Sequence, residues 1–182
     1  MTNKKEVILI ELLDVYDGFG NRTGRVVEHD NKNEVFSDNE HIGVAIIYIE
    51  NDKGEFLIQK TSKEKGGHYT STGGHISHGE DALSTIIRET NEELGVDISK
   101  DNVISLGYIC VDFPVRFLFY LKKNIDLDSL FLQKDEVESV SYKSVAEIIN
   151  ILDKGLMHKA HYKVLKKVLE YSSLNKNKTN IN

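Results

Sequence analysis

The stretch GHISHGEDALSTIIRETNEELGV, residues 74–96, joins a glycine-rich turn to an amphipathic segment. Apolar residues recur every three or four positions from Asp81 to Leu94, which predicts a helix over that range. At about 100° per residue, one side of this helix carries an apolar stripe, made of Leu83, Ile86, Ile87, Thr90 and Leu94. The stretch therefore predicts a helix with one buried face, entered from a glycine-rich turn.

Three carboxylates lie beside the buried stripe rather than opposite it. Glu89, Glu92 and Glu93 share an arc of about 100° on the helix. Like charges at these spacings weaken a helix by a few tenths of a kcal/mol per pair, and a hard divalent cation would reverse the sign of that effect. Ligation by oxygen alone suits Mg²⁺, with Mn²⁺ as a second possibility. A solvated acidic face is the alternative interpretation.

The spacing of the fixed residues decides between these interpretations. It runs Gly74, five residues, Glu80, seven residues and then RETNEELGV (88–96). This resembles the signature of the Nudix hydrolases, G-x5-E-x7-R-E-U-x-E-E-x-G-U, with U a bulky apolar residue. Every position that demands one residue type matches, which by chance has a probability on the order of one in a million. The resemblance favours a metal site. Thr90 departs from the usual aliphatic residue, and its hydroxyl can bond back to the Ile86 carbonyl.

The resemblance also implies roles for residues of the motif. Glu89, Glu92 and Glu93 would be metal ligands, and the backbone carbonyl of Gly73 would complete the inner shell. Glu92 would in addition act as a catalytic carboxylate, oriented through hydrogen bonds by Arg88.

Glu80 has two interpretations. The resemblance places it at the other acidic position of the motif and makes it a catalytic candidate. Ser77 and Glu80 also fit the S-x-x-E capping box, so a helix-start role stays open. Around them, Gly73, Gly74 and Gly79 supply a loop whose backbone can approach a phosphate closely.

Pyrophosphate hydrolysis also needs a base that takes a proton from the attacking water. Family members often carry a glutamate for this on a loop before the last strand, and DEVESV (135–140) resembles that pattern. Glu136 is the expected base, and Glu138 is the second choice.

Other residues are weaker candidates for binding. They are Lys60, Lys63, Lys65 and Arg116 for substrate phosphate, His41, Tyr69 and Tyr108 for a nucleobase, and His68, His75 and His78 for phosphate or a transition metal.

The hydrophobic period changes along the rest of the chain. Strands are expected at residues 7–15, 25–29, 41–50, 55–59, 103–111, 115–121 and 137–142, and further helices at 145–152 and 158–174. Strands mixed with three helices predict a layered α/β domain. The resemblance implies an α/β/α sandwich around a central mixed β-sheet.

Length and composition bound the organisation of the chain. With 182 residues, 40% of them hydrophobic, we expect a single domain over residues 1–174. Its N-terminal strand extension would cover about 1–40, and the polar end, 175–182, would be a disordered tail.

Composition also limits the cellular compartments and the classes of partner that we expect. Cys110 is the only cysteine, which excludes an internal disulfide, fits a reducing cytoplasm and predicts a buried structural thiol. The apolar run near the start is too short for a signal peptide or a membrane span. A net charge of -6 argues against general affinity for nucleic acid.

The resemblance implies hydrolysis of a nucleoside diphosphate linked to another group, and it makes a homodimer plausible. One alternative is isopentenyl diphosphate isomerase, because residues 11–41 are similar to the leader of that branch. Those enzymes use a cysteine close to the glycine-rich turn, where this chain has YTSTGG (69–74), so hydrolysis is preferred. A non-catalytic nucleotide sensor is the other alternative, although such members tend to lose the motif carboxylates. The base, sugar or alcohol of the substrate stays open.

Overall fold

The computed structural model describes residues 10–179, arranged as one mixed β-sheet with three α-helices. The strands are β1 (Leu12–Tyr16), β2 (Arg22–Glu28), β3 (His41–Glu50), β4 (Phe56–Thr61), β5 (Tyr69–Thr70), β6 (Thr72–His75), β7 (Ile104–Cys110), β8 (Val115–Lys122) and β9 (Val137–Lys143). The helices are α1 (Ala82–Leu94), α2 (Val145–Asp153) and α3 (His161–Thr179), with short 3-10 turns at Lys100–Asn102 and Leu127–Ser129.

β3 is the central strand of the sheet. It pairs in parallel with β8 from Gly43 to Glu50 and antiparallel with β6 and β1. β4 pairs with β5 and β9, and β7 pairs with β8. Parallel and antiparallel neighbours on one strand make the sheet mixed, as the family resemblance implies.

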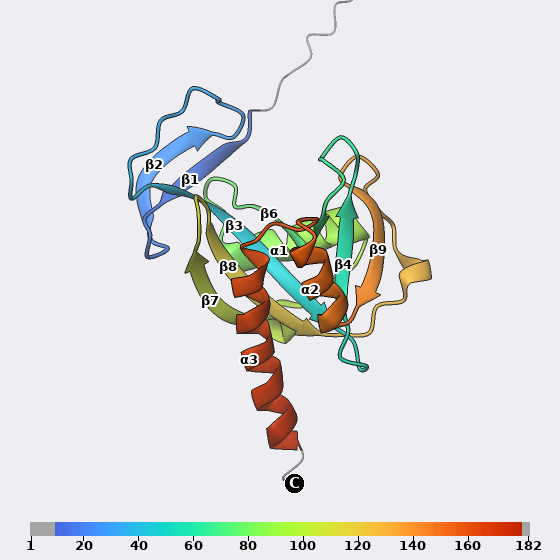
Figure 1. Cartoon of the computed structure of the whole chain (residues 1–182). Helices are drawn as coiled ribbons and strands as arrows, with labels where there is room; N and C mark the ends of the chain where they lie inside the picture. Colours follow the sequence, from blue (N-terminus) through green and yellow to red (C-terminus); the bar gives the residue numbers. More distant parts are fainter. Residues whose placement is uncertain (1–9, 180–182) are drawn as a thin grey trace, which may run out of the picture.

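The sheet separates two hydrophobic cores. Alternate residues of a strand point to opposite faces, so Ala45, Ile47 and Ile49 of β3 pack on the α1 side while Tyr48 packs on the side of α2 and α3. Figure 1 shows α2 and α3 in front of the sheet and α1 behind it. The expected α/β/α sandwich is confirmed.

The N-terminal extension forms a hairpin of β1 and β2. Leu13, Val15 and Val27 give this hairpin a small core of its own. It joins the main sheet through Val15 and Tyr16, which pair with the first residues of β3. Figure 1 shows the hairpin beside one end of the sheet. Within the described residues the predicted first strand begins at Leu12, and its predicted residues 7–9 lie outside them.

Three details differ from the expectations. Cys110 is exposed rather than buried, because among residues 10–179 β7 pairs only with β8 and leaves most of its side chains at the edge of the sheet. The glycine-rich turn contains two short strands, β5 and β6. α3 continues to Thr179, past the predicted start of the tail at Asn175; Leu174 and the lysines after it are compatible with a helix.

No helix within residues 10–179 is long and apolar enough to cross a membrane.

Candidate active site

The motif helix α1 has well-defined ends. Asp81 is its N-cap, and its side chain accepts a hydrogen bond from the backbone N–H of Ser84 at 2.9 Å. Gly95 ends the helix in the left-handed region at a φ of 68°, a conformation that glycine adopts without a steric penalty. Thr90 Oγ1 donates to the Ile86 carbonyl at 2.6 Å, as predicted. The predicted capping box of Ser77 and Glu80 is wrong, because Asp81 is the N-cap of the helix. The Glu80 side chain is therefore available for another contact.

A cavity of about 540 Å³ opens beside α1, a size typical of small-molecule sites. Its acidic lining consists of Glu89, Glu92 and Glu93 from α1, Glu136 from the segment before β9, and Glu11. Gly73 and Gly74 of β6 form the adjacent wall, and Lys65, His68, His75, Arg88 and Gln133 add polar groups. The structure therefore brings the predicted metal ligands and the predicted base to one cavity.

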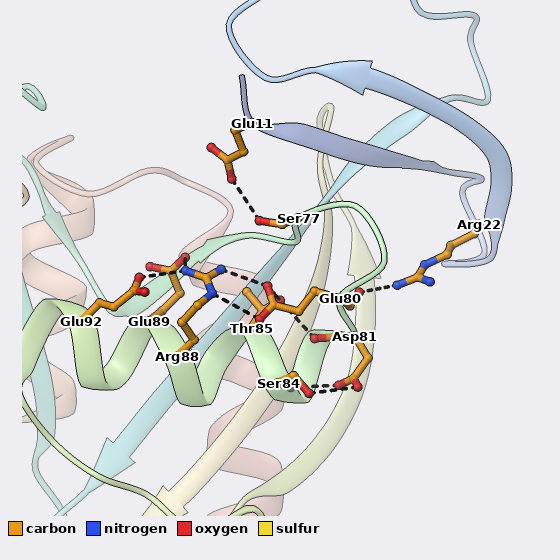
Figure 2. A network of polar contacts seen from close by, with 10 residues as sticks. All are labelled: Glu11, Arg22, Ser77, Glu80, Asp81, Ser84, Thr85, Arg88, Glu89 and Glu92. Atoms are coloured by element: carbon orange, nitrogen blue, oxygen red, sulfur yellow. Dashed lines mark hydrogen bonds and ion pairs between the residues drawn. The ribbon is translucent and has the colours of Figure 1, made fainter. Parts of the chain in front are cut away.

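Arg88 joins three carboxylates of the motif through the four hydrogen bonds of one guanidinium group. Its Nη1 donates to Glu89 Oε1 and to Glu92 Oε2, both at 2.9 Å. Its Nε and Nη2 donate to the two carboxylate oxygens of Glu80 at 3.2 and 3.0 Å. The hydrogen bond to Glu80 is the main reason that the pKa of Arg88 rises above its usual value. Figure 2 shows the guanidinium between Glu80 on one side and Glu89 and Glu92 on the other.

The carboxylates are less convergent than the helix positions predict. Within the described part of the chain, no three His, Cys, Asp or Glu side chains are already arranged to hold a metal ion. Glu89 and Glu92 both point to Arg88, and Glu93 accepts from Gln59 Nε2 at 2.9 Å instead. The guanidinium of Arg88 lies between Glu89 and Glu92 and offsets the repulsion of their like charges. Glu93 has a different partner, so the three carboxylates do not share one contact.

Two of these carboxylates sit in surroundings that disfavour a charge. Burial raises the pKa of Glu93 to about 7 and also raises the pKa of Glu89. A bound cation offsets such desolvation. The wall opposite is shaped to match: a Cβ on Gly74 would lie 2.2 Å from Glu89 Oε1, so only glycine leaves room for that carboxylate. The all-oxygen donor set and this close approach fit a hard divalent cation.

Glu136 and Glu138 differ in their surroundings. Glu136 lines the cavity, and its Oε1 lies 2.7 Å from Lys65 Nζ. Glu138 lies outside the lining residues, and it pairs with Lys60 at 2.8 Å. Ser62 ties the two loops together, because its N–H donates to the Glu136 carbonyl at 2.8 Å. The geometry favours Glu136 as the base.

Several weaker candidates lie elsewhere. Arg116 is buried and donates to the backbone carbonyls of Val111 and Pro114. Lys63 lines a separate surface hollow. His78 contacts Asp14 at 2.8 Å rather than the cavity, which argues against a site shared with His75. His41, Tyr69 and Tyr108 are not among the residues that line the cavity.

Several lining residues had no signal in the sequence. Glu11 and His29 come from the N-terminal hairpin, Gln133 comes from the loop before β9, and Ser71 lies between β5 and β6. None belongs to a recognisable motif, and long-range packing alone brings them to the cavity.

Comparison with known proteins finds a matching family model and related sequences. A family model described as NUDIX domain matches residues 39–168. Nudix hydrolase 3 of Arabidopsis thaliana is 32% identical over 162 residues, which cover 79% of this chain but 20% of that protein. The asymmetrical bis(5'-nucleosyl)-tetraphosphatase of Sus scrofa is 32% identical over 85 residues, 44% of this chain and 57% of that protein. The chain thus spans about a fifth and somewhat over half of these two relatives.

The fold has solved counterparts. The crystal structure of DR0079 from Deinococcus radiodurans matches 80% of this chain and 91% of its own, with a TM-score of 0.67 at 17% sequence identity. At that identity the likeness concerns the fold.

Proposed function

Because this chain belongs to the Nudix family, we propose that it is a Mg²⁺-dependent hydrolase of a nucleoside diphosphate linked to another group. The bond cleaved is the phosphoric anhydride of the pyrophosphate. The observation that carries this proposal is the cavity in which Glu89, Glu92 and Glu93 face Glu136 beside a glycine wall. The name of the tetraphosphatase relative supports an anhydride substrate.

In the proposed site, Glu89, Glu92, Glu93 and the Gly73 carbonyl would hold Mg²⁺, or Mn²⁺ in its place. The bound ion would neutralise charge on the two bridged phosphoryl groups and lower the pKa of the attacking water. Glu92 is the most exposed of the three carboxylates, with half of its side chain accessible. It is therefore the one best placed to contact both the ion and the substrate.

The remaining site residues would orient the metal-binding carboxylates or accept the proton of the attacking water. Glu80 holds Arg88 through two hydrogen bonds, and Arg88 in turn fixes Glu89 and Glu92. Glu136 would accept the proton of the attacking water. Lys65, now paired with Glu136, is close enough to the same cavity to meet a substrate phosphate.

The test is a panel of substrates with Mg²⁺ and with EDTA. Nucleotide sugars, dinucleotides, CDP-alcohols, nucleoside triphosphates and isopentenyl diphosphate are incubated with the protein, and released phosphates are identified. We expect Mg²⁺-dependent release of a nucleoside monophosphate from one class of linked nucleoside diphosphates. Isomerisation of isopentenyl diphosphate without hydrolysis, or tight nucleotide binding without turnover, would contradict the proposal.

The position of Cys110 favours hydrolysis over isomerisation. Cys110 lies on β7 with its Sγ 3.7 Å from His41 Nε2, and neither residue lines the cavity. The motif carboxylates are all present, which argues against the sensor alternative, because sensor members tend to lose them.

Compartment and assembly are also proposals. A cytoplasmic location is consistent with the single, exposed thiol of Cys110. A homodimer through the N-terminal hairpin is tested by light scattering of the purified protein, and a monomeric mass would exclude it.

A further inference from the structure

The β1–β2 hairpin lies outside residues 39–168, the part of the chain that the family model matches. It nevertheless packs against the loop that leads from β6 into α1. The His78 N–H donates to the Leu12 carbonyl at 2.7 Å, and Leu13 pairs with Ser77 as an isolated antiparallel bridge. The loop that carries Glu80 is therefore held by an element from outside the matched region.

Asp14 of β1 is the centre of this contact. The residue is 5% exposed, and it accepts from the Gly79 N–H at 3.0 Å and contacts His78 Nδ1 at 2.8 Å. Burial by itself would raise the pKa of Asp14, but the hydrogen bonds from Gly79 and His78 outweigh it and lower that pKa. The carboxylate is thus charged and fixed to the loop by two separate bonds.

Arg22 of β2 extends the contact to the motif. Its Nε lies 3.2 Å from Asp14 Oδ2, and its Nη2 donates to the backbone carbonyl of Glu80. The side chain of the same Glu80 accepts both bonds from Arg88, and Thr85 Oγ1 donates to it at 2.9 Å. Figure 2 shows this sequence of contacts, from Arg22 to Glu80 and on through Arg88 to the carboxylates of α1.

We propose that Asp14 and Arg22 are positioning residues for the metal site, acting through the Glu80 backbone on Arg88 and through Arg88 on Glu89 and Glu92. This inference rests on the proposed function, because it concerns the same site. If the Glu80 backbone moves, Arg88 loses its two fixed acceptors and turns freely among the carboxylates. The ligands are then no longer held in one arrangement, and the cation binds more weakly.

The test measures Mn²⁺ binding without substrate, by electron paramagnetic resonance of the free ion. Binding that Glu92→Gln removes defines the site. Partners of metal ligands typically change affinity by about 10- to 100-fold, and we expect the lower end here: Arg22→Gln and Asp14→Asn raise the Mn²⁺ dissociation constant about tenfold. A wild-type dissociation constant in both variants would overturn the inference.

Arg25→Gln is the matched control. Arg25 also lies on β2 and forms two ion pairs, but with Glu34 and Glu40, neither of which belongs to the loop before α1. We expect this variant to bind Mn²⁺ as the wild type does. An equal loss in Arg25→Gln would mean that the hairpin acts only through its general stability, and would overturn the positioning role.

Arg22→Lys covers the case in which Arg22→Gln does not fold. A single ammonium group can keep the ion pair with Asp14 but cannot also reproduce the forked contact with the Glu80 carbonyl. We expect a folded protein with a dissociation constant raised at least about threefold, below the range for direct partners of a ligand. Wild-type affinity in this variant would overturn the link through Glu80.

The inference and the proposed function fail differently. Wild-type protein that binds Mn²⁺ but turns over no member of the substrate panel contradicts the hydrolase. If its Mn²⁺ affinity still falls in Arg22→Lys and not in Arg25→Gln, the positioning role is supported. The reverse result, full turnover with unchanged affinity in every Arg22 and Asp14 variant, contradicts only the positioning role.

Discussion

Glu136 and Glu138 show how two neighbouring carboxylates acquire different chemistry. Val137 between them is fully buried in β9, which fixes the local backbone. Glu136 then faces the cavity and Lys65, whereas Glu138 faces Lys60 and a separate hollow. Sequence similarity proposes both as the base, and only the position relative to the cavity separates them.

Glu136→Gln should slow hydrolysis by about 10²- to 10⁴-fold, because a general base typically contributes that much. Steady-state kinetics on the best substrate of the panel measures the effect, and Mn²⁺ binding in the same variant should be unchanged. Glu138→Gln is the matched control and should retain the wild-type rate. Full activity in Glu136→Gln together with a loss in Glu138→Gln would assign the base to Glu138.

Glu93 illustrates a ligand whose surroundings suit the cation better than the free carboxylate. Because burial raises its pKa to about 7, the ionised side chain destabilises the metal-free protein at pH 8. Glu93→Gln should therefore increase the metal-free unfolding free energy by about 1–2 kcal/mol, after allowance for partial exposure, while metal binding is lost. Urea denaturation with EDTA measures the first effect. A less stable variant would contradict this account of Glu93.

The distance between β6 and α1 determines whether the ligands fit. Gly74→Ala would place a methyl group 2.2 Å from Glu89 Oε1 in the present arrangement, and the flexible carboxylate rather than the backbone would yield. We expect a folded protein whose Mn²⁺ affinity is at least about tenfold weaker. Circular dichroism and Mn²⁺ titration check both halves of this expectation. Unchanged affinity would show that Glu89 is not held against the glycine wall.

α3 is attached to the sheet through a buried histidine. His161 Nδ1 and the Tyr48 hydroxyl share a hydrogen bond of 2.9 Å, and burial lowers the pKa of His161 to about 3. The unfolded chain protonates this histidine below about pH 6.5, whereas the folded protein does not. Between these two values the unfolded state binds more protons, so stability falls as the pH decreases through that window.

His161→Gln should remove this pH dependence. From pH 7.5 to pH 5.5 the contribution of His161 is about 1 kcal/mol of lost stability. The comparison is between the unfolding free energies of wild type and variant at both values, since the amide can still accept from Tyr48. An identical loss in the two proteins would show that His161 is not the group responsible.

The elements with a strong local pattern were predictable from sequence. The apolar runs of β3 and β8 and the stripes of α1 and α2 lie within a few residues of their expected limits, whereas α3 runs past its expected end at residue 174 to Thr179. β5 and β6 were not predictable, because YTSTGGH contains two glycines and no aliphatic residue, and its strands form by pairing with β4 and β3. Cys110 was misplaced for a related reason, since hydrophobic content does not distinguish an edge strand from a central one.

Some residues of the candidate site were likewise predictable from sequence, and others were not. Glu89, Glu92, Glu93, Arg88 and Glu80 follow from a motif in which spacing determines geometry. The contact of Asp14 and Arg22 with the loop before α1 does not, because it joins residues 58 to 65 positions apart in the chain and no local pattern encodes it. The arrangement of the carboxylates around Arg88 likewise depends on charges that a helical projection does not weigh.

The cavity lies where four separate parts of the chain meet: the motif, the N-terminal hairpin, the segment around Lys65 and the segment around Glu136. Such a site is sensitive to the relative position of these parts, which one mixed sheet fixes. The sheet carries the motif glycines on β6 and the hairpin on β1, both paired with β3. The architecture thus accounts for the assembly of the site. The central claim concerns the reaction, which is hydrolysis of a pyrophosphate bond.

Hydrolysis in water enriched in ¹⁸O tests that claim most directly. The best substrate of the panel is converted with Mg²⁺, and the products are weighed by mass spectrometry. The account predicts two phosphorylated products, with one ¹⁸O atom in one of them, and no such labelling by Glu92→Gln or with EDTA. Absence of ¹⁸O from every phosphate product of the wild-type protein would contradict it.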